Sequence, residues 1–371
     1  MKTEEIEKIN FPGKEPEKIS RKGKVLLITS EITSGGRPFV HHHAAHCESG
    51  VTSALFRDKG LEISEPMIFG IGSGIFFGHL PFVKFVGLPI STYRCQPGAI
   101  FRKAAKRLGG KFVTQHFRNP RKGMDEMRRV LNTGQIVGLT TNIYWLSYFP
   151  NRFRFQFNGH NIIVLREIEN GFRVSDPVLD KPVDCLTEDL IRARFARGPL
   201  EPKGFMYYPV SVNHNPDLRT ACIKGMLDTC NMMLRIPLPI FGIRGIRYLA
   251  KKIITFDKAH GFEEACRQLG MIVRMQEEVG TGGAGFRYMY AAFLQEAADL
   301  FDSAELNALS QEMTAIGDIW REFAVVSARI IKKRGKQQET FAKAGGLMLI
   351  CAEREKELFK NLRDVAGKLK S

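Results

Sequence analysis

The two halves of this 371-residue chain carry different hydrophobic patterns, and the contrast limits the folds that the chain can adopt. Up to about residue 185, short β-branched runs alternate with turns and with two short amphipathic segments, as expected where strands mix with helices. Beyond that point strand signals fade, and apolar residues recur at helical spacing over residues 316–331 and 358–369. These patterns predict an α+β fold with a mainly α-helical C-terminal domain.

Turn-forming residues indicate where the chain divides. Gly198-Pro199 and the stretch 213–216 interrupt the pattern, so we place the domain boundary at residues 185–215. The predicted segments are an N-terminal extension with a first strand (residues 1–35), an α+β domain (residues 36–200) and a helical accessory domain (residues 201–371). The predicted elements within them include a strand at 24–28, strands or an apolar lining between 82 and 93, helices at 98–108 and 123–133, a strand at 135–141 and a helix with Thr187 as its N-cap.

The chain is strongly basic, with a formal net charge of +16 and a pI near 9.6. Such a charge favours acidic partners, which are nucleic acid, an anionic membrane or an acidic protein. Nucleic acid is the least favoured, because the basic residues are spread along the chain and form no recognised nucleic-acid-binding motif. Residues 236–253 have the pattern of a basic helix that rests on an anionic membrane, docks an acidic partner or is an ordinary surface helix.

Seven cysteines are scattered along the chain without a Cys-x-x-Cys pair. This spacing argues against a disulfide framework and against a zinc site, so no metal is expected. The first eight residues are highly charged and no run of 18 uncharged apolar residues occurs, so neither a signal peptide nor a transmembrane segment is expected. We therefore expect a cytoplasmic protein whose cysteines stay reduced.

Cys47 follows a His-rich stretch, residues 40–46, and opens an apolar-periodic segment that ends at Lys59-Gly60, a typical helix stop. A cysteine on the first turn of a helix lies beside unpaired N–H groups and the positive end of the helix dipole. Such a position lowers the pKa of a thiol and supplies the reactive thiolate. The alternative interpretation is a small buried residue without chemistry.

Two residues more than a hundred positions downstream favour the nucleophile. His160 opens a β-branched run, and Asp176 ends the next one, just before Pro177. Residues 169–171 between the two runs are a hairpin turn signal. Because the start of the first strand lies beside the end of the second, His160 and Asp176 come within a few residues of each other. We therefore predict Cys47 as nucleophile, His160 as general base and Asp176 as the carboxylate that orients it.

Glycine-rich stretches give less specific signals. Residues 70–74 lack the full dinucleotide fingerprint and the P-loop lysine, so we interpret them as a backbone turn; the alternative is a loop whose amides bind phosphate or a pantetheine arm. Residues 280–285 lack a Walker lysine and are interpreted as a C-terminal loop that approaches the active site. The aromatic cluster of Tyr144, Trp145 and Tyr148 lines an acyl pocket or packs in the core. The predicted substrate-binding residues are Glu65, Gly72, Ser73, Tyr144, Trp145, Gly282, Gly283 and Arg287.

These motifs resemble those of the butirosin biosynthesis protein H family of papain-like acyltransferases. The stretches that carry the N-terminal resemblance are His46-Cys47-Glu48-Ser49, Ser64-Glu65 with the glycines of residues 70–74, and the segment from Gly159-His160 to Asp176-Pro177. The spacing of 15 residues between His160 and the Asp-Pro pair is also similar to that of bacteriocin-leader peptidases of the papain-like superfamily. Residues 280–297 resemble the helical domain that usually accompanies this N-terminal domain.

The resemblance implies a papain-like cysteine protease fold for residues 36–200 and acyl transfer as the activity. Cys47 would take an acyl group from an acyl-carrier-protein thioester, and an amine or alcohol would receive it, in lipid or specialised-metabolite biosynthesis. The implied partner is an acidic acyl carrier protein, and no cofactor of the chain's own is expected because phosphopantetheine arrives on the carrier. Papain-like enzymes commonly hold a Gln several residues before the cysteine as oxyanion donor. This chain has histidines there, so His41 and His46 are the candidate oxyanion or supporting residues.

Two other functions stay open at this point. A papain-like cysteine peptidase or amidase would use the same three residues and differ only in its acceptor. A non-catalytic module that binds a carrier protein or a membrane would not need Cys47. The net charge of +16 favours a partner as acidic as a carrier protein over a peptidase substrate.

Overall fold

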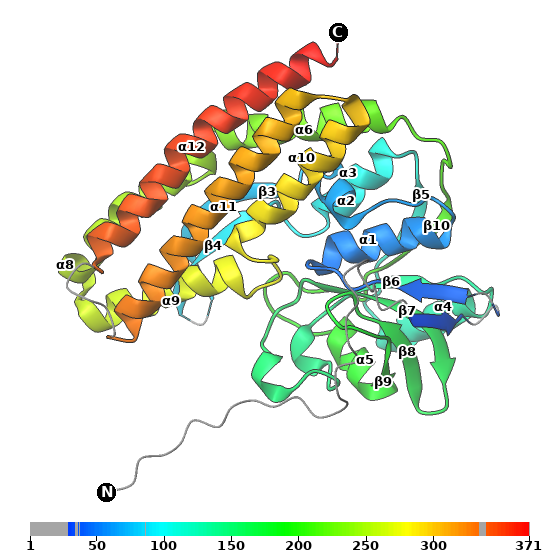
Figure 1. Ribbon diagram of the computed structural model, residues 1–371. Coiled ribbons are helices and arrows are strands. Elements are labelled where there is room, and N and C mark those ends of the chain that lie inside the picture. Colours follow the sequence, from blue (N-terminus) through cyan, green and yellow to red (C-terminus); the bar gives the residue numbers. More distant parts are fainter. Residues whose placement is uncertain (1–28, 34–35, 37, 86, 334–338, 371) are drawn as a thin grey trace, which may run out of the picture.

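The computed structural model describes residues 29–33, 36, 38–85, 87–333 and 339–370. An antiparallel sheet lies in the N-terminal half of the chain and long helices make up the C-terminal half, which confirms the predicted α+β class with a helical C-terminal part. Helix α1 (Cys47–Asp58) lies where the sheet, at the lower right of Figure 1, meets the long helices at the upper left. The predicted strand at residues 24–28 lies outside the described residues.

The central sheet is antiparallel throughout its described part. Its strands, in spatial order, are β5 (Lys111–Gln115), β10 (Met206–Ser211), β6 (Val137–Thr141), β7 (His160–Ile168), β8 (Gly171–Ser175) and β9 (Val183–Leu186). Two further antiparallel pairs are β1 (Thr29–Ile32) with β2 (Pro38–His41), and β3 (Ile75–Phe85) with β4 (Leu88–Arg94). The predicted strand at 135–141 and the predicted strands between 82 and 93 are thereby confirmed, whereas β2, which ends within the His-rich stretch 40–46, was not predicted.

Helices cover both faces of the central sheet. The helical segments of the N-terminal half after α1 are α2 (Glu65–Ile71), α3 (Ala99–Arg107), α4 (Pro120–Leu131), η1 (Ile143–Trp145), η2 (Asn151–Phe153) and α5 (Thr187–Arg194). Along β7, Ile162 and Val164 belong to the core formed with α4 and α5, whereas Ile163 and Leu165 belong to the core that contains α1. This alternation is the period of two that a strand buried on both faces requires.

The C-terminal half consists of helices that pack mainly on one another. They are α6 (Leu218–Leu234), α7 (Gly242–Ile254), α8 (Phe256–His260), α9 (Phe262–Glu277), η3 (Ala284–Phe286), α10 (Arg287–Phe301), α11 (Ala304–Ile331) and α12 (Phe341–Lys368). Helix α12 runs along α7 and α11, and Figure 1 shows it as the outermost long helix. The two long periodic segments in the sequence are therefore confirmed as α11 and α12.

The larger hydrophobic core joins the two halves of the chain. Helix α2 packs against α10 so closely that a Cβ on Gly70 would lie 2.0 Å from a ring carbon of Phe293. Phe77 of β3 stacks on Trp320 of α11, with ring centroids 6.3 Å apart. Helix α1 contributes Val51 to the same core. The α+β part and the helical part thus share one apolar interior.

Local start and stop signals account for most helix ends. Helix α1 ends at Asp58 with Gly60 at φ +84°, as the Lys59-Gly60 stop predicts. Helix α4 starts at Pro120, before the predicted residue 123, because the Asn119 side chain accepts a hydrogen bond from the Lys122 N–H and Pro120 suits the first helical position. The N-cap of α5 is Leu186 rather than Thr187, because Leu186 keeps the extended backbone of β9.

In the parts of the chain that the structure describes, no helix combines the length and the apolar character needed to cross a bilayer.

Candidate active site

Cys47 is the first residue of α1, and the turn before it is fixed by hydrogen bonds. His46 is the N-cap, with extended backbone (φ −136°, ψ 131°), and its Nδ1 accepts from the Ser49 N–H at 3.4 Å. The Glu65 carboxylate accepts from the N–H groups of Ala45 (2.9 Å) and His46 (2.8 Å). Among the described residues no acceptor pairs with the N–H of Cys47 itself, as expected for the first residue of a helix.

His160 and Asp176 are in direct contact. His160 Nε2 donates to Asp176 Oδ2 at 2.7 Å, and both side chains are buried. The predicted β7–β8 hairpin brings them together, with Ile163 paired to Ser175. The turn lies one residue earlier than Asn170-Gly171, since Ile168 pairs with Gly171, and a register shift follows Val164. Both changes bring His160 closer to Asp176 than a regular hairpin with its turn at Asn170-Gly171 would.

The Asp176 carboxylate has two further donors that fix its position. Its Oδ2 also accepts from the Tyr148 hydroxyl at 2.8 Å, and its Oδ1 accepts from the Val178 N–H at 3.2 Å. With Nε2 of His160 engaged by Asp176, Nδ1 is the ring nitrogen that remains for the Cys47 thiol. Phe149 packs edge-on against the same imidazole, with ring centroids 5.8 Å apart.

The Cys47 thiol lies against the start of β7. Its Sγ is 3.8 Å from the Gly159 carbonyl oxygen and 3.9 Å from Asn161 Nδ2. Burial raises the pKa of this thiol, but a hydrogen bond with His160, the charges of His160 and Arg94 and the backbone N–H of Asn161 together outweigh burial. The pKa of Cys47 is therefore lowered from its ordinary value, and the groups that lower it are His160, Arg94 and Asn161.

The pKa of His160 is shifted in the opposite direction to that of Cys47. Burial lowers the pKa of His160, but the charge and hydrogen bond of Asp176 and the contact with Cys47 outweigh it and raise the pKa to about 10. Each partner thus favours the charged form of the other, which is a thiolate–imidazolium pair. Burial instead raises the pKa of the other six thiols, which are those of Cys95, Cys185, Cys222, Cys230, Cys266 and Cys351.

A buried ion pair lies beside the thiol. Arg94 Nη1, at the end of β4, donates to Glu48 Oε2 at 2.8 Å, and Glu48 is the residue that follows Cys47. Glu48 Oε1 also accepts from the Phe101 N–H at 3.1 Å. The charge of Arg94 lowers the pKa of Cys47, and burial and the Arg94 charge lower that of His46, so Arg94 contributes to the electrostatics of the site.

The two candidate oxyanion histidines differ in how their ring nitrogens are used. His41 Nδ1 lies 2.8 Å from Ser175 Oγ, and its Nε2 lies 2.8 Å from the Leu179 carbonyl oxygen, so both nitrogens are engaged. His46 Nε2 is buried and, among the described residues, has no hydrogen-bond partner. Burial and neighbouring positive charge hold the pKa of His46 well below its usual range, so the ring is neutral. Of the two histidines, His46 therefore retains a nitrogen available for a ligand.

In this structure the predicted substrate-binding residues near α2, which are Glu65, Gly72 and Ser73, contact other parts of the protein. Glu65 binds the turn before Cys47, and its pKa is raised by burial despite the donors around it. Gly72 is the C-cap of α2, packed against Ile100, and Ser73 is a buried residue with φ +53° whose hydroxyl meets Arg107 at 2.7 Å. This arrangement corresponds to the turn interpretation of residues 70–74.

The predicted aromatic pair lies on the surface side of η1. Tyr144 is exposed, Trp145 is half-buried, and their rings meet edge-on at 5.1 Å. Arg192 of α5 stacks over Trp145 at 5.5 Å. Tyr148, three residues further on, is the member of the cluster that reaches Asp176.

The glycine-rich loop of residues 280–285 approaches the turn that precedes Cys47. A Cβ on Gly282 would lie 3.0 Å from Ala45 Cβ, and one on Gly280 would lie 3.9 Å from the His46 ring. Gly283 instead lies against Arg321 of α11. Phe286, at φ +69°, places its ring edge-on to His46 at 5.1 Å.

Arg287, the last of the predicted substrate-binding residues, faces the helical interior. It forms a fully buried bidentate ion pair with Glu355, both bonds at 2.9 Å, and donates to the Gly285 carbonyl at 2.7 Å. Its guanidinium also stacks over Trp320 at 4.9 Å. These contacts engage Arg287 within the helical part and stabilise the loop beside His46.

Sequence reasoning missed four residues that surround the triad: Glu48, Arg94, Tyr148 as a partner of Asp176, and Asn161. Asn161 directly follows His160 and Glu48 directly follows Cys47, so adjacency was the signal that could have found them. Arg94 had no such signal, since only the tertiary fold brings the end of β4 to Glu48.

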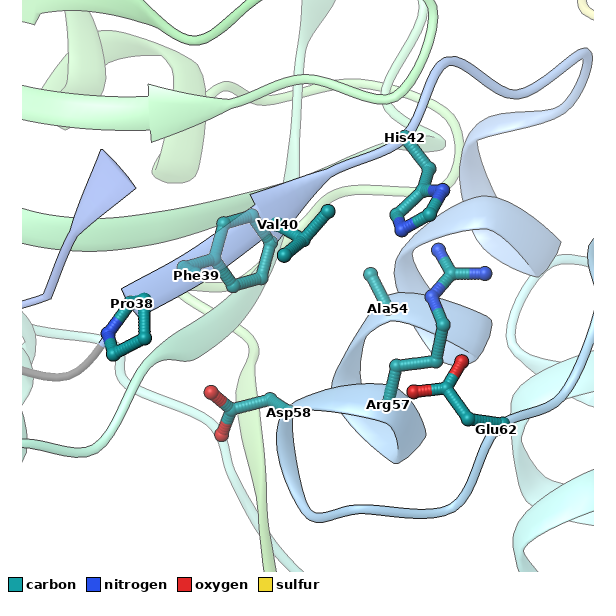
Figure 2. A pocket seen from close by; sticks show the side chains of 8 residues that line it. All are labelled: Pro38, Phe39, Val40, His42, Ala54, Arg57, Asp58 and Glu62. Atoms are coloured by element: carbon teal, nitrogen blue, oxygen red, sulfur yellow. The ribbon is translucent and has the colours of Figure 1, made fainter. Parts of the chain in front are cut away.

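The pocket shown in Figure 2 is separate from this cysteine site. It has a volume of about 280 Å³ and lies between β2 and the C-terminal end of α1. His42 and Arg57 lie close together on one side of it, with Glu62 beside Arg57. The residues that line it are Pro38, Phe39, Val40, His42, Ala54, Arg57, Asp58 and Glu62, so no member of the triad takes part.

Fold and site together define an α+β protein with a buried Cys–His–Asp cluster at a helix start, followed by a helical region. Residues 46–177 match the family described as butirosin biosynthesis protein H, N-terminal, and residues 188–362 match a domain of unknown function (DUF4872). No curated protein matches the sequence significantly. The two matches in this order show that the chain belongs to the butirosin biosynthesis protein H-like family, which indicates a biosynthetic enzyme of the acyltransferase class.

Proposed function

We propose that this protein transfers an acyl group from an acyl-carrier-protein thioester to an amine or alcohol through an acyl-enzyme on Cys47. In this proposal the N-terminal part is a papain-like cysteine domain, with His160 as general base and acid and Asp176 as the orienting carboxylate. The observation that carries the proposal is the lowered pKa of a thiol at a helix start, next to an imidazole that Asp176 binds at 2.7 Å.

The first half-reaction forms the acyl-enzyme. The Cys47 thiolate attacks the thioester carbonyl carbon, a new C–S bond forms, and the bond from that carbon to the carrier's sulfur breaks. The leaving thiolate takes the proton from Nδ1 of the His160 imidazolium. Asp176 keeps the ring oriented throughout, because its carboxylate is itself fixed by Tyr148 and Val178.

The second half-reaction releases the acyl group to the acceptor. The amine or alcohol attacks the acyl-enzyme carbonyl, His160 takes the acceptor's proton, and Cys47 leaves as thiolate. The negative oxygen of each tetrahedral intermediate needs hydrogen-bond donors. The unpaired N–H of Cys47 is one donor in this proposal, and the second candidate is His46, whose Nε2 is unpartnered.

The proposed donor partner is an acidic carrier protein. The net charge of +16 supports such a partner through electrostatic steering. The phosphopantetheine arm would come with the carrier, so the enzyme would need no cofactor of its own. The acceptor would be a lipid headgroup, a polyamine or a specialised metabolite.

A transfer assay tests the proposal. The protein is mixed with carrier proteins loaded with different acyl chains and with a panel of amines and alcohols, and acylated products are measured by mass spectrometry. We expect transfer by the wild type, and a loss of about 10³-fold or more in kcat/KM for both Cys47→Ala and His160→Gln. Cys266→Ala, which changes a thiol with a raised pKa on α9, is the matched control and should keep full activity.

The same assay separates the alternatives. Cleavage of peptides or amides by the wild type, without transfer from any carrier, would identify a cysteine peptidase or amidase instead. Carrier binding that is equal in wild type and Cys47→Ala, without any turnover, would identify a non-catalytic binding module. Either result would contradict the proposal.

A further inference from the structure

The β3–β4 hairpin ends in a tip with apolar side chains in water. Phe82 is 87% exposed and Val83 is 49% exposed, and the exposed Lys84 follows them. An aromatic ring this far from the core does not contribute to the packing of the protein. Exposed apolar side chains next to basic residues are typical of surfaces that bind a membrane or another protein.

The hairpin runs beside α7, in the same direction along the chain. Near the start of both elements, a Cβ on Gly245 of α7 would lie 3.2 Å from Phe77 Cδ1 of β3. Two residues further along β3, the ring centroids of His79 and Tyr248 are 6.2 Å apart. The Gly78–Phe241 bridge attaches the start of β3 to the residue before α7.

Beyond these contacts, both elements continue toward one end of the molecule. The next exposed residues of β3 are Phe82 and Val83, and the next exposed residues of α7 are Lys251 and Lys252. Helix α8 follows α7 directly and adds the exposed Lys258. The apolar hairpin tip and three lysines therefore lie at the same end of the molecule.

Helix α7 is strongly amphipathic. Ile246, Leu249 and Ile253 are buried on its inner face, which packs on α12. In the parts of the chain that the structure describes, no acidic side chain pairs with Lys251, Lys252 or Lys258. Asp257 beside Lys258 is an exposed acidic neighbour, and at the start of α9 Glu263 pairs with Lys333 and Glu264 with Arg267.

We propose that this surface, defined as Phe82, Val83, Lys84, Lys251, Lys252 and Lys258, docks the protein on an anionic membrane. Phe82 and Val83 enter the boundary between headgroups and acyl chains, and the lysines face the lipid phosphates. Exposed apolar side chains together with lysines favour an anionic lipid surface over a protein partner, because the lipid phosphates complement the lysines and the acyl chains take up the ring. The inference does not depend on the chemistry proposed for Cys47.

Vesicle sedimentation tests the inference with the full chain. The probes are vesicles of phosphatidylcholine alone and of phosphatidylcholine with about 30% phosphatidylserine, at low and high salt. We expect binding to the anionic vesicles only, weakened by salt. Lys251→Glu/Lys252→Glu should weaken it by about 30-fold or more and Phe82→Ser by about tenfold.

Matched controls separate this surface from net charge and from general hydrophobicity. Arg121→Glu/Lys122→Glu on α4 makes the same charge change elsewhere, and Val210→Ser removes another exposed apolar side chain. Both should keep vesicle binding, and all variants should keep the wild-type melting temperature. Equal loss in the controls, or no binding of wild type to anionic vesicles, would overturn the inference. Binding of an acidic carrier protein that only Lys251→Glu/Lys252→Glu weakens, without vesicle binding, would instead identify a protein-docking surface.

Discussion

At the scale of single residues, the chemistry of Cys47 depends chiefly on His160, which contributes most to lowering its pKa. Burial alone favours the neutral thiol, and the contact with His160 reverses that preference. The His160 charge in turn depends on Asp176, which is why a residue with no contact to the sulfur determines its reactivity. Among the residues that the structure describes, no histidine lowers the pKa of another cysteine, and burial raises the pKa of each of the other six.

The first prediction follows from this difference in thiol pKa. Iodoacetamide at neutral pH should modify Cys47 first among the seven cysteines, and the rate should fall as pH drops through the lowered pKa of Cys47. In His160→Gln the pKa of Cys47 should rise, since the hydrogen bond and the charge of His160, the largest contributions that lower it, are lost, and the rate at pH 7 should fall about tenfold or more. Peptide mass spectrometry measures both rates. Equal labelling of several cysteines, or an unchanged rate in His160→Gln, would contradict the thiolate–imidazolium pair.

The second prediction ranks the residues behind the imidazole. Asp176→Asn removes the charge that raises the pKa of His160 and should lower kcat/KM by about 10²–10⁴-fold. Tyr148→Phe removes only one hydrogen bond to the carboxylate and should lower it by about tenfold. The transfer assay measures both, with melting temperatures as the control for folding. A Tyr148→Phe loss as large as that of Asp176→Asn would mean that Tyr148 acts on the substrate directly.

At the scale of elements, the start of α1 is assembled from three parts of the chain. Glu65 of α2 binds the turn, the β7–β8 hairpin supplies His160, and the C-terminal loop places Phe286 against His46. The hairpin was predictable because a turn signal between two β-branched runs fixes which residues face each other. The C-terminal loop was expected near the site, but the particular contact of Phe286 with His46 depends on tertiary packing that no local pattern encodes.

The third prediction concerns the buried N-cap. The pKa of His46 is lowered well below 6.5 in the folded chain, so its contribution to stability is present above the unfolded pKa and is lost as pH falls below about 6.5. His46→Asn keeps a good N-cap without this titration. Between pH 8 and pH 5 the variant should therefore gain up to about 2 kcal/mol in unfolding free energy relative to wild type.

Urea unfolding of both proteins at pH 8 and pH 5 measures this gain. His79, whose pKa burial lowers to about 4, titrates in both proteins, so its effect cancels from the comparison. The same stability difference between the two proteins at both pH values would show that His46 does not stay neutral when folded.

At the scale of the whole molecule, the two predicted domains share an interior. The α+β class and the long helices followed from periodicity, which records the burial of each element. Periodicity does not show which elements share a core. Although α2 and β3 come early in the sequence, α2 packs on α10 and β3 contacts α11 through Phe77. The domain boundary near residue 200 stays a prediction, and the contacts of Gly70 with Phe293 and of Phe77 with Trp320 cross it.

The fourth prediction uses the closest of these contacts. Gly70→Ala places a methyl group 2.0 Å from a ring carbon of Phe293, so it should lower the unfolding free energy by about 1–3 kcal/mol. Gly346→Ala is the matched control, because its Cβ meets nothing within 4 Å on α12, and it should stabilise by about 0.5–1 kcal/mol. Chemical unfolding followed by circular dichroism measures both. Similar stability of the two variants would contradict the shared core.

The central claim is that Cys47 carries the acyl group during transfer. The most direct measurement is intact-mass and peptide mass spectrometry after mixing the protein with acyl-loaded carrier proteins and no acceptor. We predict a mass increase equal to one acyl group, located on the peptide that contains Cys47 and absent in Cys47→Ala. An acyl adduct on another residue, or one that persists in Cys47→Ala, would contradict the account.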